Sequence, residues 1–209
     1  MERILIDGLS FAIPLFVMAI GGIYSEKSGV TNLALEGLQG MGAFIGAFVA
    51  VLAAGYFGSN SQVPYYLAIV CAMAGGMLYS LLYGLLCIRL KANQIIGGVV
   101  INILAMSLTA FFTKLLNRLV FGAASEKFVL PLLSGIPVIG AAFKDVYPFE
   151  ILILLIAVVA WYVLYKTRYG MNLRACGDNP HAVDAAGENV TRIRLIAVLV
   201  SGALSGLAG

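Results

Sequence analysis

Long apolar runs, each close to the length that a helix needs to cross a membrane, dominate this chain. They cover residues 4–24, 37–57, 64–88, 91–112 and 149–165, and a sixth begins near residue 193. A bilayer is crossed by a helix of about 20 apolar residues. Only 11% of the residues are charged, against roughly a quarter in soluble domains. The sequence therefore predicts an all-α, polytopic transmembrane bundle of about six spans or partial spans.

We interpret residues 1–209 as one transmembrane domain. About 17 residues of the sixth run precede Gly209, and no charged residue follows them. We therefore expect a chain that is incomplete at its C-terminus. The stretch 114–147 contains Pro131 and Pro137 in a semi-apolar segment, and Pro148 follows it. Such a segment is too short and too interrupted by proline to cross a membrane, so we predict a re-entrant or interfacial piece on the outer face.

Residues 21–40 are too polar and glycine-rich for a plain span and too apolar for a solvated loop. Irregular backbone at membrane depth is tolerated only where protein or trapped water satisfies it, so we predict a broken or re-entrant segment here. Residues 21–28 superficially resemble a phosphate-binding loop, but Glu26 replaces its second glycine, so we expect no ATP binding by this chain. Glu36 has two open interpretations: it faces a solute path, or it is a first-turn helix charge at the interface.

Small residues recur at four-residue spacing in the second and third runs. They are Gly42, Gly46, Ala50 and Ala54 in one run, and Ala72, Gly76, Ser80 and Gly84 in the other. Such ridges let helices approach closely within a membrane. Asn102 lies inside the fourth run, where an amide must bond either a neighbouring helix or a polar solute.

The polar stretch 166–194 separates the last two runs and predicts a docking loop. Asp178 or Asn179 can cap a short helix, Pro180 suits its first turn and Gly187 can end it. The small apolar surface of this helix is formed by Ala182, Val183, Ala185 and Ala186. A helix of about two turns is unstable alone, so we expect its neighbours to hold it and another protein to contact it. A solvated connector is the alternative.

Basic residues set the expected topology. Five of them cluster in residues 166–194, and Arg89 and Lys91 lie two spans earlier. We therefore place both regions in the cytoplasm and residues 114–147 outside. The N-terminus is then outside, unless the segment 24–36 itself crosses the membrane.

Two motifs carry a family resemblance: S-x-x-x-G-V-x-N-x-x-L-E-G at residues 25–37 and R-A-x-G-x-N-P-x-A-x-x-x-A-G at residues 174–187. The chain resembles the membrane permeases of ATP-binding-cassette importers, in the family shared by branched-chain amino acid, monosaccharide and nucleoside permeases. The form of the first motif is most similar to nucleoside and simple-sugar permeases. The resemblance implies a nucleoside as substrate, with ribose-type monosaccharides second and branched-chain amino acids third.

The resemblance further implies a bacterial cell membrane protein in a complex. Its partners would be cytoplasmic ATPases that bind the ATP, a second identical or homologous permease subunit, and an extracytoplasmic solute-binding protein. The coupling helix within 166–194 would contact the ATPase through Arg174, Gly177, Asn179, Pro180, Ala182, Val183, Ala186 and Gly187. For a neutral polyhydroxyl solute, the candidate path residues are Asn32, Glu36, Asn102 and Ser107.

Other classes of protein fit the sequence less well. A secondary transporter would carry more ionisable residues in mid-span. An enzyme would need a catalytic set, whereas the single histidine, His181, lies in the polar stretch, and no metal-ligand spacing occurs. We therefore expect a transport subunit without catalytic residues, metal or cofactor. The net charge of +3 gives no sign of nucleic-acid binding.

Overall fold

The computed structural model describes residues 2–57, 61–116 and 148–209, and all regular structure in these ranges is helical. The elements are α1 (Glu2–Lys27), α2 (Leu35–Phe57), α3 (Val63–Gly84) with a π-helical turn (Leu85–Arg89), α4 (Gln94–Leu115), α5 (Pro148–Lys166), α6 (Arg168–Asp178), α7 (Pro180–Ala185) and α8 (Val190–Ala208). Helices α2, α3, α4 and α8 are long and apolar enough to cross a membrane, and α5 with α6 forms a further pair bent by 70°. The predicted polytopic helical bundle is confirmed. The outer-face piece predicted within 114–147 lies almost wholly outside the described residues.

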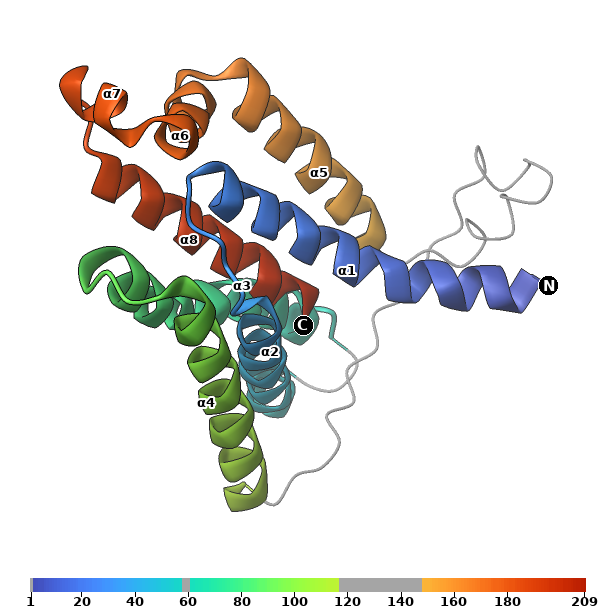
Figure 1. The fold of residues 1–209 in the computed structure, drawn as a ribbon. Coiled ribbons are helices and arrows are strands. Elements are labelled where there is room, and N and C mark those ends of the chain that lie inside the picture. The colour runs from blue at the N-terminus through green and yellow to red at the C-terminus, as the bar shows by residue number, and fades with distance from the viewer. Residues whose placement is uncertain (1, 58–60, 117–147) are drawn as a thin grey trace.

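Helix α8 lies at the centre and packs against α1, α2 and α3 (Figure 1). Glycines make these contacts close. Any side chain at Gly42 of α2 would overlap the backbone of Gly206 in α8, and one at Gly76 of α3 would overlap the carbonyl oxygen of Gly202. The predicted small-residue ridges are therefore the surfaces on which α2, α3 and α8 meet.

Helices α4 and α5 have the opposite character, because most of their apolar side chains are exposed. In α4 these include Ile95, Ile96, Val99, Val100, Ile103 and Met106. In a membrane protein such faces meet lipid or another membrane subunit, and lipid provides no drive to bury them. Helix α4 also diverges from the rest of the bundle along its length (Figure 1).

One end of the bundle collects most of the connections. Helices α1, α3 and α5 end there, α4 and α8 begin there, and α6 and α7 lie there beside the start of α8 (Figure 1). We call this the hairpin end, after the adjacent short helices α6 and α7. It brings the polar stretch 166–194 next to the irregular segment that follows α1, although more than 130 residues separate them in the sequence.

The polar stretch contains more helix than the sequence predicted. Residues 168–178 form the eleven-residue helix α6 rather than part of a loop. The Thr167 side chain accepts a hydrogen bond from the Gly170 amide at 3.2 Å and caps the helix. Gly170 has no room for a side chain, because one would overlap the Leu164 carbonyl. The glycine thus allows α6 to fold back directly on the end of α5.

Candidate functional site

The first part of the candidate site is the non-helical segment 28–34 between α1 and α2, which we call the helix break. Helix α1 ends at Lys27, and the Ser25 hydroxyl donates to the Val30 carbonyl at 2.7 Å. Gly29 has φ of +84°, a conformation that side-chain-bearing residues rarely adopt. The break predicted in residues 21–40 is therefore a tight turn that starts within the first of the two sequence motifs.

Side chains from three other helices bond the backbone of the helix break. Tyr83 of α3 donates to the Thr31 carbonyl at 2.5 Å, and Gln94 of α4 accepts from the Thr31 amide at 2.8 Å. Arg194 of α8 donates through Nε to the Ser28 carbonyl at 3.0 Å. Non-helical backbone among apolar helices needs such partners, because lipid supplies none.

The helix break descends into the bundle from the hairpin end. Ser28 contacts Arg194, whereas Asn32 donates to the Ser201 hydroxyl at 2.9 Å, seven residues further along α8. Seven residues of helix rise about 10 Å. The start of α2 therefore lies about two turns inside the bundle, and Glu36 in its first turn lies there too.

The two predicted path asparagines are both bonded within the protein. Asn32 is buried, and its Oδ1 accepts from the Ala34 amide at 3.0 Å. Asn102 donates to the Leu33 carbonyl at 2.9 Å and accepts from the Gly37 amide at 2.8 Å. Asn102 of α4 thus caps the start of α2. Of the two predicted alternatives, a bond to a neighbouring helix or to a polar solute, this is the bond to a neighbouring helix.

The other two predicted path residues are exposed. The Glu36 side chain makes no hydrogen bond to any residue in the described ranges. Ser107 lies on α4 and donates only to the Ile103 carbonyl of its own helix, at 2.9 Å. Of the four predicted path residues, Glu36 is the one with a free side chain beside the helix break.

The second part of the candidate site is the pair α6 and α7, which we call the hairpin. Helix α7 has six residues, and the Asn179 side chain accepts from the Ala182 amide at 3.2 Å. At the other end, the Glu188 amide donates to the Val183 carbonyl and the Gly187 amide to the Asp184 carbonyl, with φ of +85° at Gly187. This is a Schellman ending. The short helix, its Asn179 cap, Pro180 in the first turn and the Gly187 ending follow the prediction.

One member of the predicted apolar surface of α7 points inward. Val183 is 6% exposed and packs with Leu173 and Cys176 of α6 and Ile193 of α8. Ala182, Ala185 and Ala186 are exposed. Val183 therefore anchors α7 to its own chain, and the outer surface of α7 consists of small and polar side chains.

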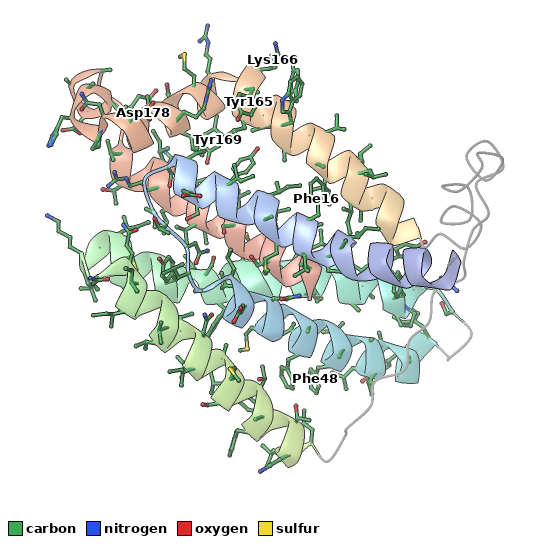
Figure 2. All side chains as sticks on the ribbon, turned by 45° about the vertical axis from the view of Figure 1, so that its right-hand side comes forward. Phe16, Phe48, Tyr165, Lys166, Tyr169 and Asp178 are labelled. Carbon is green, nitrogen blue, oxygen red and sulfur yellow. The ribbon has the colours of Figure 1, made fainter. Side chains whose placement is uncertain are left out.

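Arg174 and Gly177, which were predicted to contact a partner, lie against the protein's own helices. The Arg174 guanidinium lies 5.1 Å from the centre of the Tyr165 ring. Tyr165, which is labelled in Figure 2, lies at the C-terminal end of α5. A side chain on Gly177 would lie 2.5 Å from the Lys27 carbonyl oxygen at the end of α1. Both residues hold α6 to the bundle.

Two buried groups of the hairpin, the Tyr169 hydroxyl and the Cys176 thiol, are held in their protonated forms. Burial raises the pKa of the Tyr169 hydroxyl to about 12 and also raises the pKa of the Cys176 thiol. A protonated, fully buried thiol is not a nucleophile. The part of the chain that the structure describes holds no cluster of side chains that could bind a metal ion.

Three cavities lie near these parts. One of about 350 Å³ is lined by Gly42, Gly46, Ala50, Ala68, Ala72 and Leu207, where α2, α3 and α8 meet. A polar cavity of about 310 Å³ lies between the end of α1 and the end of α6, beside Glu26, Lys27, Gly177 and Asp178. A third, of about 370 Å³, lies at the end of α7, beside Asp184 and residues 187–191. None of the three is lined by any of the four predicted path residues.

Several residues at the site were missed in the sequence. Tyr83, Gln94, Arg194 and Ser201 all bond the helix break from other helices. Arg194 was interpreted only as a topology signal. The one sign in the sequence was its position where the polar stretch meets the sixth apolar run, four residues into α8, since a charge at the start of a span needs a partner.

Comparison with known proteins agrees with the two motifs. A family model described as the permease component of branched-chain amino acid transport systems matches residues 4–209. The guanosine ABC transporter permease NupQ of Bacillus subtilis is 40% identical over 96% of this chain. The nucleoside ABC transporter permease NupC of Lactococcus lactis is 36% identical over the whole chain.

A third relative, the putative glucose ABC transporter permease TsgC13 of Haloferax volcanii, is 32% identical over 93% of this chain. The matches cover 64%, 66% and 57% of NupQ, NupC and TsgC13. The chain thus spans less than two thirds of the length of these relatives. No solved structure has significant similarity to it.

Proposed function

The chain belongs to the permease family of branched-chain amino acid transport systems, and on that premise we propose that it is a permease subunit of an ATP-binding-cassette importer for nucleosides. In this proposal the chain is a transport subunit and not an enzyme. Its helices form part of the solute path, and its hairpin receives the movement of a separate ATPase that binds and hydrolyses the ATP.

The hairpin is the observation that carries this proposal. Helix α7 is capped at both ends by its own residues and is anchored through the buried Val183. His181, Ala182, Asp184 and Ala185 are all exposed. A preformed short helix that presents small side chains fits into a cleft of another protein at little entropic cost. In the family this helix is the one that sits in the ATPase.

The complex would contain further subunits. We propose a second permease, identical or homologous, two ATPases in the cytoplasm, and a solute-binding protein on the other side of the membrane. The exposed apolar faces of α4 and α5 suit contact with lipid or with that second permease. Hydrolysis in the ATPases would move the two hairpins and so alternate access to the path.

Glu36 supports the position of the path. Its carboxylate is exposed although it lies about two turns inside the bundle, and an ionisable group at that depth requires water or a protein partner. We propose that it faces the solute path beside the helix break. Asn32, Asn102 and Ser107 would contribute there as supports of the backbone or through their remaining hydrogen-bonding capacity.

The preference for nucleosides rests on the names of the relatives NupQ and NupC and on the first motif. Uptake of labelled guanosine into cells that express the complete importer tests it, with unlabelled guanosine, ribose and leucine as competitors. Competition by guanosine alone is expected. Competition by ribose or leucine alone would assign the importer to monosaccharides or branched-chain amino acids instead.

Coupling through α7 is tested by adding a bulky charge to its outer surface. In the complex reconstituted in proteoliposomes, Ala182→Glu or Ala186→Glu should reduce the stimulation of ATP hydrolysis by loaded binding protein about tenfold, within the usual range of coupling energies. Ala92→Glu is the matched control, because Ala92 is also exposed at the hairpin end. Unchanged stimulation in both α7 variants would contradict the docking role.

A further inference from the structure

Three helix ends meet at one point of the hairpin end: the end of α1, the end of α6 and the first turns of α8. A Cβ atom on Gly177 would lie 2.5 Å from the Lys27 carbonyl oxygen and 3.3 Å from the Gly29 amide nitrogen. The backbone of the hairpin therefore lies directly on the backbone of the helix break, without side chains between them.

Arg194 joins these two backbones. Its Nε donates to the Ser28 carbonyl at 3.0 Å, and its Nη2 donates to the Cys176 carbonyl at 3.3 Å. Cys176 lies in the last turn of α6, where carbonyl groups lack helical partners, and Ser28 directly follows α1. One guanidinium thus serves two helix C-termini, whose partial negative charge favours a cation.

The chemistry of this contact requires arginine. A guanidinium presents several N–H donors in a rigid planar fork, so it can hold two acceptors at a fixed separation. A lysine ammonium is a single point on a flexible stem and cannot reproduce that geometry. A residue that only marked topology would need its positive charge alone.

Beyond Arg194, the helix break is bonded to the helices that surround it. Tyr83 and Gln94 hold Thr31, and Asn102 holds both Leu33 and the first turn of α2. A displacement of Ser28 would therefore reach α2, α3 and α4 through hydrogen bonds between these side chains and the backbone of the break. The hairpin has no comparably direct bond to α2 or α4 among the described residues.

We propose that Arg194 is the positioning residue that transmits movement of the hairpin to the helix break and thus to the start of α2. This inference rests on the proposed function. It goes beyond it by naming the contact through which docking at α7 reaches the path: the hairpin, the Arg194 guanidinium and the break move as one unit when the ATPase displaces α7.

The test compares two conservative variants in reconstituted proteoliposomes, Arg194→Lys and Arg192→Lys. Arg192 is exposed, two residues away on the same helix, and its side chain makes no hydrogen bond within the described ranges. Arg194→Lys should assemble with the ATPase and retain basal ATP hydrolysis, while solute moved per ATP falls about tenfold. Arg192→Lys should match the wild type. A purely structural role would instead reduce assembly and both activities together.

A second variant tests the same contact without changing Arg194. In Gly177→Ala the added methyl group forces the hairpin away from Lys27, so it should also lower solute moved per ATP. Gly55→Ala is its control, because that position has open space around it. Normal coupling in both Arg194→Lys and Gly177→Ala would overturn the inference. If Arg194→Lys fails to assemble, Gly177→Ala decides alone.

A third measurement does not depend on transport. The Cys176 thiol is fully buried, so release of the hairpin in Arg194→Gln should speed its alkylation by a maleimide severalfold, read by mass spectrometry of the Cys176 peptide. Equal alkylation rates in Arg194→Gln and wild type would show that the guanidinium does not hold the hairpin. Absence of ATP-driven uptake in the wild type would instead contradict the proposed function and leave this measurement valid.

Discussion

The helix break and helix α7 are both short segments that join longer helices, yet they are held in opposite ways. Residues 28–34 are bonded by side chains of α3, α4 and α8, from positions 52 to 169 residues away in the sequence. Helix α7 is capped by its own neighbours, and Val183 is its buried anchor.

The difference follows from the surroundings of each segment. Backbone groups inside an apolar bundle must find protein partners, because each unsatisfied group costs several kcal/mol in lipid. At the end of the bundle, water can serve the same groups. A segment that is hydrogen-bonded to several helices can transmit a displacement from one helix to another. A segment that is held by its own caps keeps its shape when another protein binds it.

The largest effect on stability is expected from Asn102→Leu. It removes the partners of the Leu33 carbonyl and the Gly37 amide. The free energy of unfolding should fall by about 2 kcal/mol, because an orphaned group that lipid or protein shields from water costs about 1–3 kcal/mol. The melting temperature of the variant in detergent measures this loss of stability. Ser107→Ala is the control and should change little, because Ser107 is exposed on another face of α4 and bonds only its own helix. An unchanged melting temperature in Asn102→Leu would mean that the break is not held from outside.

A smaller effect is expected from Tyr83→Phe, which removes the hydroxyl that bonds the Thr31 carbonyl. The ring stays in the core, so only the hydrogen bond is lost, at about 1 kcal/mol. Tyr66→Phe is the matched control because Tyr66 is exposed. Equal melting temperatures for the two variants would remove Tyr83 from the set of residues that hold the break.

In α7, Asn179→Ala should act locally. Loss of the cap weakens the helix by about 1 kcal/mol, but global unfolding should hardly change because few other contacts depend on α7. Exchange of the amide hydrogens of residues 181–186 should accelerate while the melting temperature stays constant. His181→Ala, an exposed change in the same helix, should alter neither. A large drop in melting temperature would show that α7 is part of the core.

The smallest effect on stability is expected from Glu36→Ala, within about 0.5 kcal/mol, as for other exposed sites. Its carboxylate makes no hydrogen bond to the described residues, although it directly follows the helix break. Uptake of labelled guanosine should nevertheless change if this group faces the path. Wild-type uptake kinetics in Glu36→Ala would leave it as a first-turn helix charge.

Local rules predicted α7 well and the helix break only in outline. Asn179, Pro180 and Gly187 act on groups within a few residues of themselves, so their roles can be read along the sequence. The partners of the break come from distant helices, and an apolar run gives no sign that Tyr83 or Ser201 faces residues 28–34 rather than lipid. Asn102 was found because an amide in a span must bond something.

Two errors in the hairpin have physical causes. Helix α6 was missed because it is polar and contains two glycines, both of which serve close backbone contacts with α5 and α1. Val183 was grouped with the three alanines of the apolar surface because a helix of six residues has too little periodicity to show which of them is buried. Contacts with other helices determine both the fold of α6 and the burial of Val183.

The glycine contacts among α2, α3 and α8 limit how such a protein can change shape. Side chains at a helical interface can change rotamer and so let the helices slide past each other. In this protein the backbones themselves are in contact at Gly42, Gly76, Gly202 and Gly206. No side chain at these four positions can change rotamer to make room. Sliding would require these helices to part entirely. Any alternation of access would therefore move the parts of α2, α3 and α8 around these glycines as one block and leave the change of shape to the hairpin end, the helix break and the attachments of α4 and α5.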